Sequence, residues 1–397
     1  MNSDAAVARL KSAEWLKRAE TQRVYALLDG PKNKIRAVGG IVRDTLLDRP
    51  RDLAEIDFAT ELLPQEVMKR AGEAGIAAYP TGIEHGTVTL KVNELVAEIT
   101  TLRQDVETDG RHAVVKFGRD WTRDAQRRDF TLNALYVGMD GTLFDPLDGI
   151  EDCLRGVVRF IGDPDRRIAE DRLRVYRFFR FSASHGGERF DLGGLDAVRR
   201  AATTLGALSA ERVGAEMRRM LGLPHVAKTL DTMAAANVAP LPQPLREWMA
   251  AYERRAHKPN LPARLALMLP VVGAEQIRER WRLSNDDLHV AEMILKAARL
   301  LIEFHVNEAA YRYPAALADA VDVAATIAGW TEAGKSAVVE HLAGIDVPKF
   351  PLTGNDLLQN GMRPGPALGA ELERLERKWI SSNFTLDRAG LLAELRR

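Results

Sequence analysis

The spacing of hydrophobic positions divides the chain into three stretches. Between residues 5 and 28 apolar side chains recur at helical spacing up to a Gly-Pro pair, which predicts a leading helix. From 35 to 149, short runs rich in β-branched residues predict strands at 36–38, 56–59, 76–80, 86–92, 95–101, 134–138 and 142–145. Helical spacing at 42–47 and 64–75 lies between these strands. We therefore expect a mixed sheet that carries a few helices.

Beyond residue 161 the strand pattern stops and helical spacing dominates. Long helices are expected at 166–183, 210–221, 286–304, 313–328 and 366–380. A mixed sheet followed by a long helical remainder is typical of the α+β class. A chain of 397 residues is too long for one compact core, so about two to four domains are expected.

Charge and cysteine content narrow the setting in which the chain works. Its 56 Lys and Arg residues balance 56 Asp and Glu residues, so any nucleic-acid surface depends on local clusters of basic side chains. Cys153 is the single cysteine, which excludes an intrachain disulfide and predicts a packing role in a reducing compartment. The first residues lack the apolar run of a secretory signal, and 261–272 is too short to span a bilayer. These features predict a cytoplasmic protein without membrane association.

Two glycines lie where a predicted strand gives way to a helix. Gly39 and Gly40 follow Val38, and Arg43 lies one helical turn further on. Backbone N–H groups in such a turn can point at a phosphate, and no Cβ blocks its approach. Simple chain reversal explains a Gly-Gly pair about equally well.

Carboxylates gather on two of the predicted strands. Glu55 and Asp57 are two residues apart, so both side chains leave the same face of their strand. Glu98 alternates with apolar residues in 95–101 and would complete a three-carboxylate cluster if the two strands are neighbours. Hard cations such as Mg²⁺ suit such a cluster, and phosphoryl transfer uses them. A solvated strand face is the alternative explanation for an isolated acid pair.

Two basic residues precede the apolar segment that follows residue 129. Arg127 and Arg128 would deliver guanidinium groups to phosphates if a rigid element holds them. Basic pairs are also common on solvated helices.

The segment 163–180 carries a second set of charged residues. An Asp-Pro pair at 163–164 favours a helix start. On one continuous helix Asp171 and Arg174 would be neighbours at i and i+3, and Arg177 and Arg180 would continue the same ridge. An intrahelical ion pair with solvated arginines is the plainer interpretation.

A carboxylate beside a guanidinium can also select a base. Cytosine and adenine both present an amino donor next to a ring-nitrogen acceptor, whereas uracil and guanine present a carbonyl next to an N–H. The fixed pair of Asp171 and Arg174 would satisfy the first two bases and leave buried groups unpaired against the others.

These motifs, in this order, resemble the class II tRNA nucleotidyltransferases (the CCA-adding enzymes) and bacterial poly(A) polymerases of the polymerase β superfamily. The matching segments cover roughly the N-terminal half: 39–44, 55–60, 100–103, 127–134, 163–180 and 208–212. The resemblance implies a polymerase β-like nucleotidyltransferase head at 1–160 and a helical neck with a base-reading helix at 161–225. It further implies a helical body and tail at 226–397 that bind tRNA.

The resemblance also implies roles for single residues. Glu55 and Asp57 would hold Mg²⁺, with Glu98 as the third catalytic acid. Asp171 with Arg174 would read the base. The nucleotide site would further include Gly39, Gly40, Arg43, Arg127, Arg128, Arg177 and Arg180.

The implied reaction is template-independent addition of CCA to the 3′ end of tRNA from CTP and ATP, with release of pyrophosphate. One residue departs from the family pattern, because the first metal ligand is normally aspartate and this chain has Glu55. Asp52 is an alternative ligand, but Glu55 keeps the same-face spacing to Asp57. The segment 103–117 resembles the flexible loop that the family needs for the final adenosine. At 265–270 the His-Asp pair of a phosphohydrolase is missing, so no hydrolase activity is expected.

Three alternatives stay open. A poly(A) polymerase shares these motifs and adds AMP repeatedly to RNA 3′ ends. An enzyme that adds only the final A is a narrower version of the same activity. A catalytically inactive RNA-binding protein is the third, because of Glu55 and the large helical half. Protein partners are not indicated by the sequence.

Overall fold

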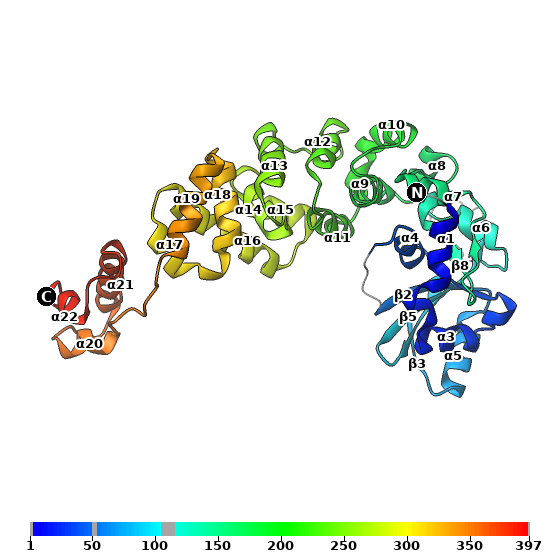
Figure 1. Cartoon of the computed structure of the whole chain (residues 1–397), viewed down its shortest axis with the longest axis horizontal. Coiled ribbons are helices and arrows are strands. Elements are labelled where there is room, and N and C mark those ends of the chain that lie inside the picture. Colours follow the sequence, from blue (N-terminus) through cyan, green and yellow to red (C-terminus); the bar gives the residue numbers. More distant parts are fainter. Residues whose placement is uncertain (1–2, 50–53, 105–115, 396–397) are drawn as a thin grey trace. The chain divides into compact units, whose positions relative to one another are not determined.

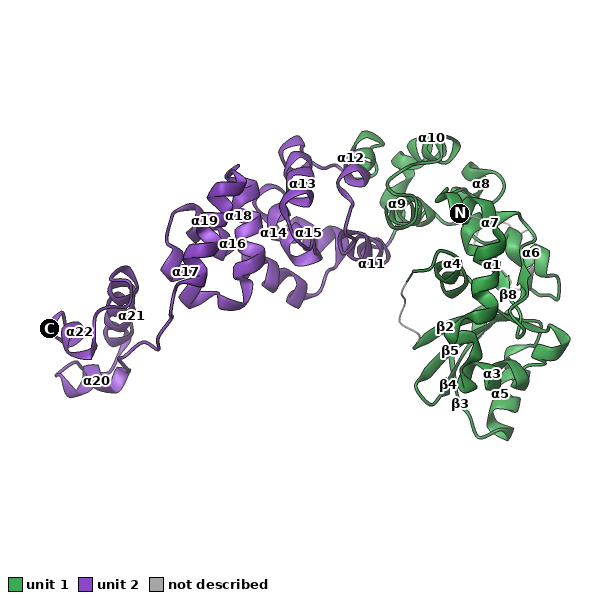
Figure 2. Ribbon diagram, in the orientation of Figure 1, with its two compact units in different colours: residues 1–208, 232–239 green, residues 209–231, 240–397 purple. Residues whose placement is uncertain are grey.

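The computed structural model describes residues 3–49, 54–104 and 116–395 (Figure 1). Its internal contacts form two compact units (Figure 2). Unit 1 comprises Met1–Leu208 with Thr232–Ala239, and unit 2 comprises Ser209–Asp231 with Pro240–Arg397. The division of the chain at residues 160 and 225 stays a prediction.

A seven-stranded sheet forms the centre of the described part of unit 1, in the order β3-β4-β5-β2-β1-β8-β9. Its strands are β1 Ile35–Val38, β2 Glu55–Thr60, β3 Ala77–Gly82, β4 Thr87–Val92, β5 Leu95–Thr101, β8 Tyr136–Val137 and β9 Leu143–Phe144. Strands β2 and β5 run parallel, and the other described neighbours run antiparallel. The expected mixed sheet is confirmed.

Alternation of side chains gives this sheet one apolar face. In β4 and β5 every second residue is buried, among them Val88, Leu90 and Ile99, while the residues between them are at least partly exposed. Helix α5 (Pro64–Glu73) contacts β3 and β4, and α3 (Ala19–Leu27) contacts β5. The polar side chains of β4 and β5 are thereby left to the opposite face.

Two helices expected to be continuous are broken. The predicted leading helix consists of three separate helices, α1 (Ser3–Ser12), α2 (Glu14–Lys17) and α3. It is interrupted at Ala13 and Arg18, because their ψ angles of 129° and 138° are extended. The predicted helix at 166–183 is also wrong as a single element. It ends at Asp171, where φ is −149° and ψ is 104°. The remaining helices of this part of unit 1 are α4 Gly40–Leu46, α6 Trp121–Gln126, α7 Gly149–Arg155, α8 Pro164–Glu170, α9 Arg174–Ser184 and α10 Leu192–Ala201.

Beyond residue 208 the described secondary-structure elements are all helices, as expected. Among these residues and those of unit 1, no helix is both long and apolar enough to cross a lipid bilayer. The helices are α11 Ala210–Leu221, α12 Ala227–Ala235, α13 Gln243–Arg255, α14 Leu261–Val272, α15 Ala274–Trp281, α16 Asn285–Ile302, α17 Val306–Arg312, α18 Leu317–Ile327, α19 Glu332–Ala343, α20 Gly354–Gln359, α21 Pro366–Ser381 and α22 Arg388–Ala393.

Cys153 lies in α7 and is buried. Burial raises the pKa of its thiol to about 12, since the thiolate would lose its hydration. The thiol therefore stays protonated, and the predicted packing role is confirmed.

Candidate active site

The pairing of β2 with β5 brings the three predicted carboxylates to one face of the sheet. Asp57 is the direct partner of Glu98, and Glu55 lies two residues before Asp57 on the same strand. Side chains of paired residues in neighbouring strands leave the same face. Glu55 is exposed, whereas Asp57 and Glu98 are half-buried.

The arrangement of the three carboxylates shifts the pKa of the Glu98 carboxyl. Burial raises its pKa above the ordinary value, and the charges of Asp57 and then Glu55 raise it further. As the pH falls, Glu98 is therefore biased towards protonation by its two acidic neighbours. A divalent cation placed among these groups would relieve the same repulsion.

The carboxylates fit a metal ion that shares its ligands with a substrate. Within residues 3–49, 54–104 and 116–395, no group of three His, Cys, Asp or Glu side chains is arranged to hold a metal ion by itself. Mg²⁺ is commonly bound through one or two carboxylates together with substrate phosphates and water. Glu55 and Asp57 supply a donor set of that kind. Asp52, the alternative ligand, lies outside the described residues.

The glycine turn has the backbone geometry that its sequence predicts. Gly39 is the residue before α4 and has φ 73° and ψ −123°, a conformation that L side chains rarely adopt. A Cβ there would come no closer than 3.9 Å to the Asn133 carbonyl oxygen, so conformation rather than space requires glycine. The N–H groups of the first turn of α4 follow at Gly40 and Ile41.

The Arg43 side chain is held by other side chains of this chain. Its side chain donates from Nη1 to Asn133 Oδ1 at 2.6 Å and from Nε to Asp44 Oδ1 at 3.0 Å. The residue is only 6% exposed, and its guanidinium lies 5.1 Å from the Phe181 ring centroid. These contacts tie α4 to the segment 129–133 and to α9. They favour an orienting role, and direct contact of Arg43 with phosphate stays a prediction.

His185, which follows α9, completes this buried polar group. Its Nε2 lies 3.1 Å from Asp44 Oδ1, and its Nδ1 lies 2.6 Å from the Ser184 hydroxyl. Burial lowers the His185 pKa to about 4, more than the hydrogen bond to Asp44 raises it. Asp44 is half-buried, which raises its pKa, but hydrogen bonding by His185 and the charge of Arg43 hold this pKa below the ordinary range.

Unit 1 should lose stability at mildly acidic pH because of His185. An unfolded histidine takes up a proton near pH 6.5, whereas folded His185 stays neutral until about pH 4. Stability contributed by the neutral imidazole is therefore lost as the pH falls from 6.5 towards 4, by about 2 kcal/mol between pH 7 and 5. Urea denaturation followed by hydrogen exchange of unit 1 peptides measures this slope. His185→Gln should flatten it, and His85→Gln, at an exposed position, should not. Equal slopes in all three proteins would contradict the assignment.

Arg127 and Arg128 share one buried carboxylate that sequence analysis missed. Asp124, 1% exposed, accepts from Arg127 Nε at 2.9 Å and from Arg128 Nη2 at 3.3 Å. It also accepts from the Tyr136 hydroxyl at 2.9 Å and the Arg103 backbone N–H at 3.4 Å. The i+3 and i+4 spacing from Asp124 to the two arginines was the available signal. The pair is thus held at the end of α6, as the rigid-element interpretation requires.

Arg177 and Arg180 extend from α9. Arg177 Nε donates to Asp129 Oδ2 at 2.8 Å, and Asp129 Oδ1 accepts from Asn133 Nδ2 at 3.1 Å. The Arg180 guanidinium lies 4.1 Å from the Phe181 ring centroid. Arg177 therefore joins α9 to the residue that directly follows the arginine pair.

Asp171 and Arg174 have different partners, so the predicted i, i+3 geometry on one helix is wrong. Asp171 Oδ1 accepts from the Leu173 N–H at 3.1 Å, which stabilises the break between α8 and α9. Arg174 Nη1 donates to Glu170 Oε2 at 2.6 Å, and Nη2 donates to the Arg127 carbonyl at 3.2 Å. Arg174 nevertheless reaches the segment that carries the arginine pair.

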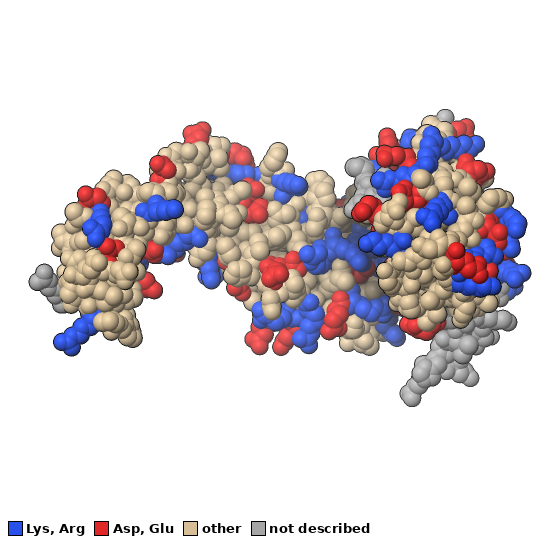
Figure 3. Space-filling model, turned by 90° about the horizontal axis from the view of Figure 1, so that it is seen from below, with Lys and Arg blue, Asp and Glu red and all other residues tan. Residues whose placement is uncertain are grey.

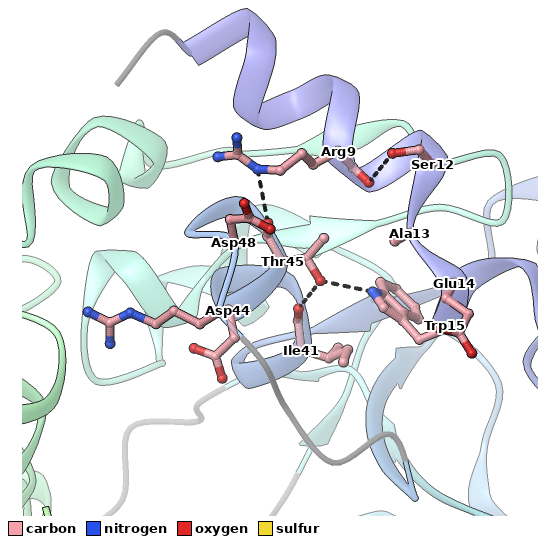
Figure 4. A pocket seen from close by; sticks show the side chains of 10 residues that line it. Arg9, Ser12, Ala13, Glu14, Trp15, Ile41, Asp44, Thr45 and Asp48 are labelled. Atoms are coloured by element: carbon pink, nitrogen blue, oxygen red, sulfur yellow. Dashed lines mark hydrogen bonds between the residues drawn. The ribbon is translucent and has the colours of Figure 1, made fainter.

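A cavity of about 380 Å³ lies between α1, α2 and α4 (Figure 4). Trp15 Nε1 donates to Thr45 Oγ1 at 2.9 Å, and Thr45 Oγ1 donates to the Ile41 carbonyl at 2.7 Å. Of the predicted site residues none lines this cavity. The hydrogen bond from Trp15 to Thr45 holds α4 against α2.

The base of the predicted loop at 103–117 is a two-stranded ladder, β6 (Arg103–Gln104) with β7 (Lys116–Phe117). A Cβ at Gly86, where φ is 82°, would come within 2.6 Å of the Phe117 ring, so glycine permits this packing. Residues 105–115, on which the loop prediction rests, lie outside the described residues.

Comparisons with known proteins agree along the chain. Residues 35–159 match the model of the poly A polymerase head domain. The mitochondrial CCA tRNA nucleotidyltransferase 1 of Danio rerio is 32% identical over 91% of this chain and 87% of that protein. A CCA-adding enzyme of Limosilactobacillus fermentum is 30% identical over 89% of this chain and 90% of that protein.

Solved structures agree as well. The Bacillus stearothermophilus CCA-adding enzyme in complex with CTP superposes with a TM-score of 0.74 and 27% identity, covering 92% of this chain and 94% of that one. The Thermotoga maritima CCA-adding enzyme has the same fold, with a TM-score of 0.68 at 19% identity, and covers 99% of this chain and 98% of that one. From these similarities along nearly its whole length, the chain belongs to the CCA tRNA nucleotidyltransferase family.

Proposed function

We propose that this chain adds CCA to the 3′ end of tRNA from CTP and ATP, without a nucleic-acid template. The observation that carries the proposal is identity of 32% over 91% of the chain to a protein named as a CCA tRNA nucleotidyltransferase. In each step the terminal 3′ hydroxyl loses its proton to solvent and its oxygen forms a bond to the α-phosphorus. The bond from this phosphorus to the bridging oxygen breaks, and pyrophosphate leaves.

The carboxylates of β2 and β5 would align this reaction. Glu55 and Asp57 would hold Mg²⁺, which supplies charge neutralisation for the triphosphate and acidifies the attacking hydroxyl. Glu98 faces the same side as Asp57 and would orient the hydroxyl by hydrogen bonding. The family generally uses a divalent metal, and Mg²⁺ is our specific proposal.

Phosphate binding would fall to the glycine turn and to the arginines that Asp124 positions. The first N–H groups of α4 and the guanidinium groups of Arg127 and Arg128 would contact the triphosphate. Arg43 and Arg177 would keep these elements together, through the contacts to Asn133 and Asp129.

Base selection by Asp171 and Arg174 requires both side chains to exchange partners. Arg174 would leave Glu170, and Asp171 would leave the Leu173 N–H, when a cytosine or adenine edge offers complementary groups. Arg180, in the same helix as Arg174, would support the base reader.

Arg174→Ala should damage the choice of base more than triphosphate affinity. Loss of the guanidinium donor removes the penalty against U and G. The ratio of kcat/KM for CTP to kcat/KM for UTP should therefore fall by at least about tenfold. Competition between CTP and UTP at a fixed RNA concentration measures the ratio. Arg166→Ala, which removes an exposed arginine of α8, is the matched control. An unchanged preference in Arg174→Ala would refute the assignment.

Unit 2 would contribute tRNA phosphate contacts. On the face drawn in Figure 3, basic side chains of the helical part are interspersed with acidic ones. Exposed basic residues there include Arg254, Lys258, Arg278 and Arg280. Such contacts weaken as the salt concentration rises, because the release of counterions then contributes less free energy. We also propose that the protein is located in the cytoplasm.

Incubations of three tRNA transcripts with three nucleotide mixtures test the proposed function. Transcripts of tRNA that end at the discriminator base, or after one or two added cytidines, are supplied with CTP, ATP or both. We expect two C additions from CTP, one A addition only after CC, and then a stop. Addition of A alone would favour the narrower A-adding enzyme. No pyrophosphate release with Mg²⁺ or Mn²⁺ would leave an RNA-binding protein.

A poly(A) polymerase is the second candidate, favoured by the match to the poly A polymerase head domain. It predicts long A tails on unstructured RNA with ATP alone. The same incubations with a single-stranded RNA separate the two activities.

A further inference from the structure

The row of residues that contains Asp57 continues across the sheet to its edge. Asp57 is paired with Glu98, Glu98 with Thr89, and Thr89 with Tyr79 on β3. Paired residues project from the same face, so four side chains from four strands lie in one line. Neighbouring strands are about 4.8 Å apart, which places Tyr79 about 14 Å from Asp57 along this line.

This face of the sheet is polar and open near Tyr79. The tyrosine is 51% exposed, although β-strand aromatic residues usually pack against a neighbour. Threonine hydroxyls lie beside it, with Thr81 Oγ1 2.7 Å from Thr89 Oγ1 and Thr87 Oγ1 3.1 Å from Thr100 Oγ1. Hydroxyl groups therefore lie along and beside the line from the carboxylates to Tyr79.

A bulge in the edge strand directly follows Tyr79 and re-aims Thr81. Between Tyr79 and Gly82 the register of β3 against β4 shifts, so two residues of β3 stand opposite Val88. The shift lets both Tyr79 and Thr81 reach Thr89, although alternation across an unbulged pair would place Thr81 opposite Thr87. Bulges are common where a side chain is re-aimed next to a functional site.

We propose that this face is the track for the single-stranded 3′ end of the acceptor RNA, with one upstream base stacked on Tyr79. The inference rests on the proposed function, which places the reacting 3′ hydroxyl at Asp57 and Glu98. Stacked nucleotides advance about 3.4 Å along a strand, so 14 Å corresponds to about four nucleotides, or fewer in an extended strand. The base on Tyr79 therefore lies two to four nucleotides before the end.

The chemistry of the face fits RNA. Carboxylates repel phosphates, so the strand must approach through its bases and riboses, for which the threonine hydroxyls offer partners to each 2′-OH. Stacking on an aromatic ring tolerates any base, which suits an enzyme that must accept many RNA ends. Addition of a peptide strand to the β3 edge is disfavoured, because Pro80 lacks an N–H and the bulge disrupts the ladder.

Steady-state kinetics of the full chain on an acceptor-stem RNA tests the track. Stacking contributes about 1–3 kcal/mol per base, so Tyr79→Ala should raise the KM for RNA about fivefold to a hundredfold. The KM for CTP and the kcat at saturating RNA should stay within about twofold. Tyr79→Phe should keep the wild-type KM, since its ring still stacks. Leu192→Ala removes another exposed apolar side chain, 77% exposed on α10, and should change nothing.

An RNA series with one abasic site locates the stacked base. At one position, two to four nucleotides before the end, the abasic penalty seen with the wild type should vanish in Tyr79→Ala. Additive penalties at every position, an unchanged KM for RNA, or a rise in the KM for CTP instead would overturn the proposal.

A measurement of RNA binding without CTP or ATP tests the track independently of the proposed function. Fluorescence anisotropy of the labelled RNA with wild type and Tyr79→Ala should show the same fivefold or greater loss of affinity. If the wild type extends no RNA, the proposed function fails, while this binding difference still supports the track. Equal affinities would reject the track even in an active enzyme.

Discussion

Asp57→Asn should abolish nucleotide transfer while the fold and RNA binding remain. The amide keeps the volume of the side chain, and its position on the half-buried polar face leaves the apolar core untouched. Loss of the charge removes one of the ligands proposed for Mg²⁺, and a bound cation supplies several kcal/mol of transition-state stabilisation. At about 1.4 kcal/mol per factor of ten, incorporation should fall by about a thousandfold in single-turnover assays.

The effect should be specific to the carboxylate row. Glu94 is an exposed acid in the turn between β4 and β5, so Glu94→Gln removes an equal charge from the same sheet and should leave transfer unchanged. Asp57→Asn should also lower the Glu98 pKa towards its ordinary value, because the charge of Asp57 helps to raise it. Carbon-detected NMR titration measures this shift. Activity above about a tenth of wild type would contradict the metal-ligand role.

Strand β5 was predictable because its burial alternates. β5 was expected at 95–101 and spans Leu95–Thr101, with buried and half-buried residues in strict alternation. The same alternation placed Glu98 away from the core. Its pairing with Asp57 was not predictable, because α5, β3 and β4 separate the two strands along the chain. Local spacing indicates which face a side chain takes, and long-range pairing decides its neighbour.

The helix expected at 166–183 was mispredicted for a related reason. The apolar spacing of Ile168 and Val175 continues across the break at Asp171, so periodicity alone predicts one helix. A tertiary contact from Arg174 to the Arg127 carbonyl accompanies the break. Asp124 shows the complementary case, since its spacing to the arginine pair was visible but its burial was not.

Arg264→Ala should destabilise unit 2 by about 3–5 kcal/mol, as expected when one partner of a buried ion pair is removed. The Arg264 side chain is fully buried and donates from Nη1 to the carbonyls of Leu221 and Leu223, both at 2.6 Å. Its Nη2 donates to the Pro224 carbonyl at 2.9 Å and to Glu253 Oε1 at 2.7 Å. Alanine would leave these acceptors without their donor.

Because of the contacts of Glu253, Arg264→Ala should lose more stability than the removal of one ion pair alone would cost. Its Oε1 also accepts from the backbone N–H groups of Val226 and Ala227, at 2.7 and 3.0 Å. Arg264 and Glu253 together thus satisfy donors and acceptors of the connection between α11 and α12. Without the guanidinium, the carboxylate would remain buried and uncompensated, and the connection would open to water.

Hydrogen exchange of the full chain resolves this effect, because a protein with two units need not unfold in one step. Peptides covering 221–227 should exchange faster in Arg264→Ala. Arg264→Lys should be intermediate, since one ammonium cannot reproduce the planar fork that reaches four acceptors. Arg218→Ala breaks the exposed pair with Asp287 and should cost no more than about 1 kcal/mol. If both alanine variants were equally stable, the buried pair would not be what holds this connection.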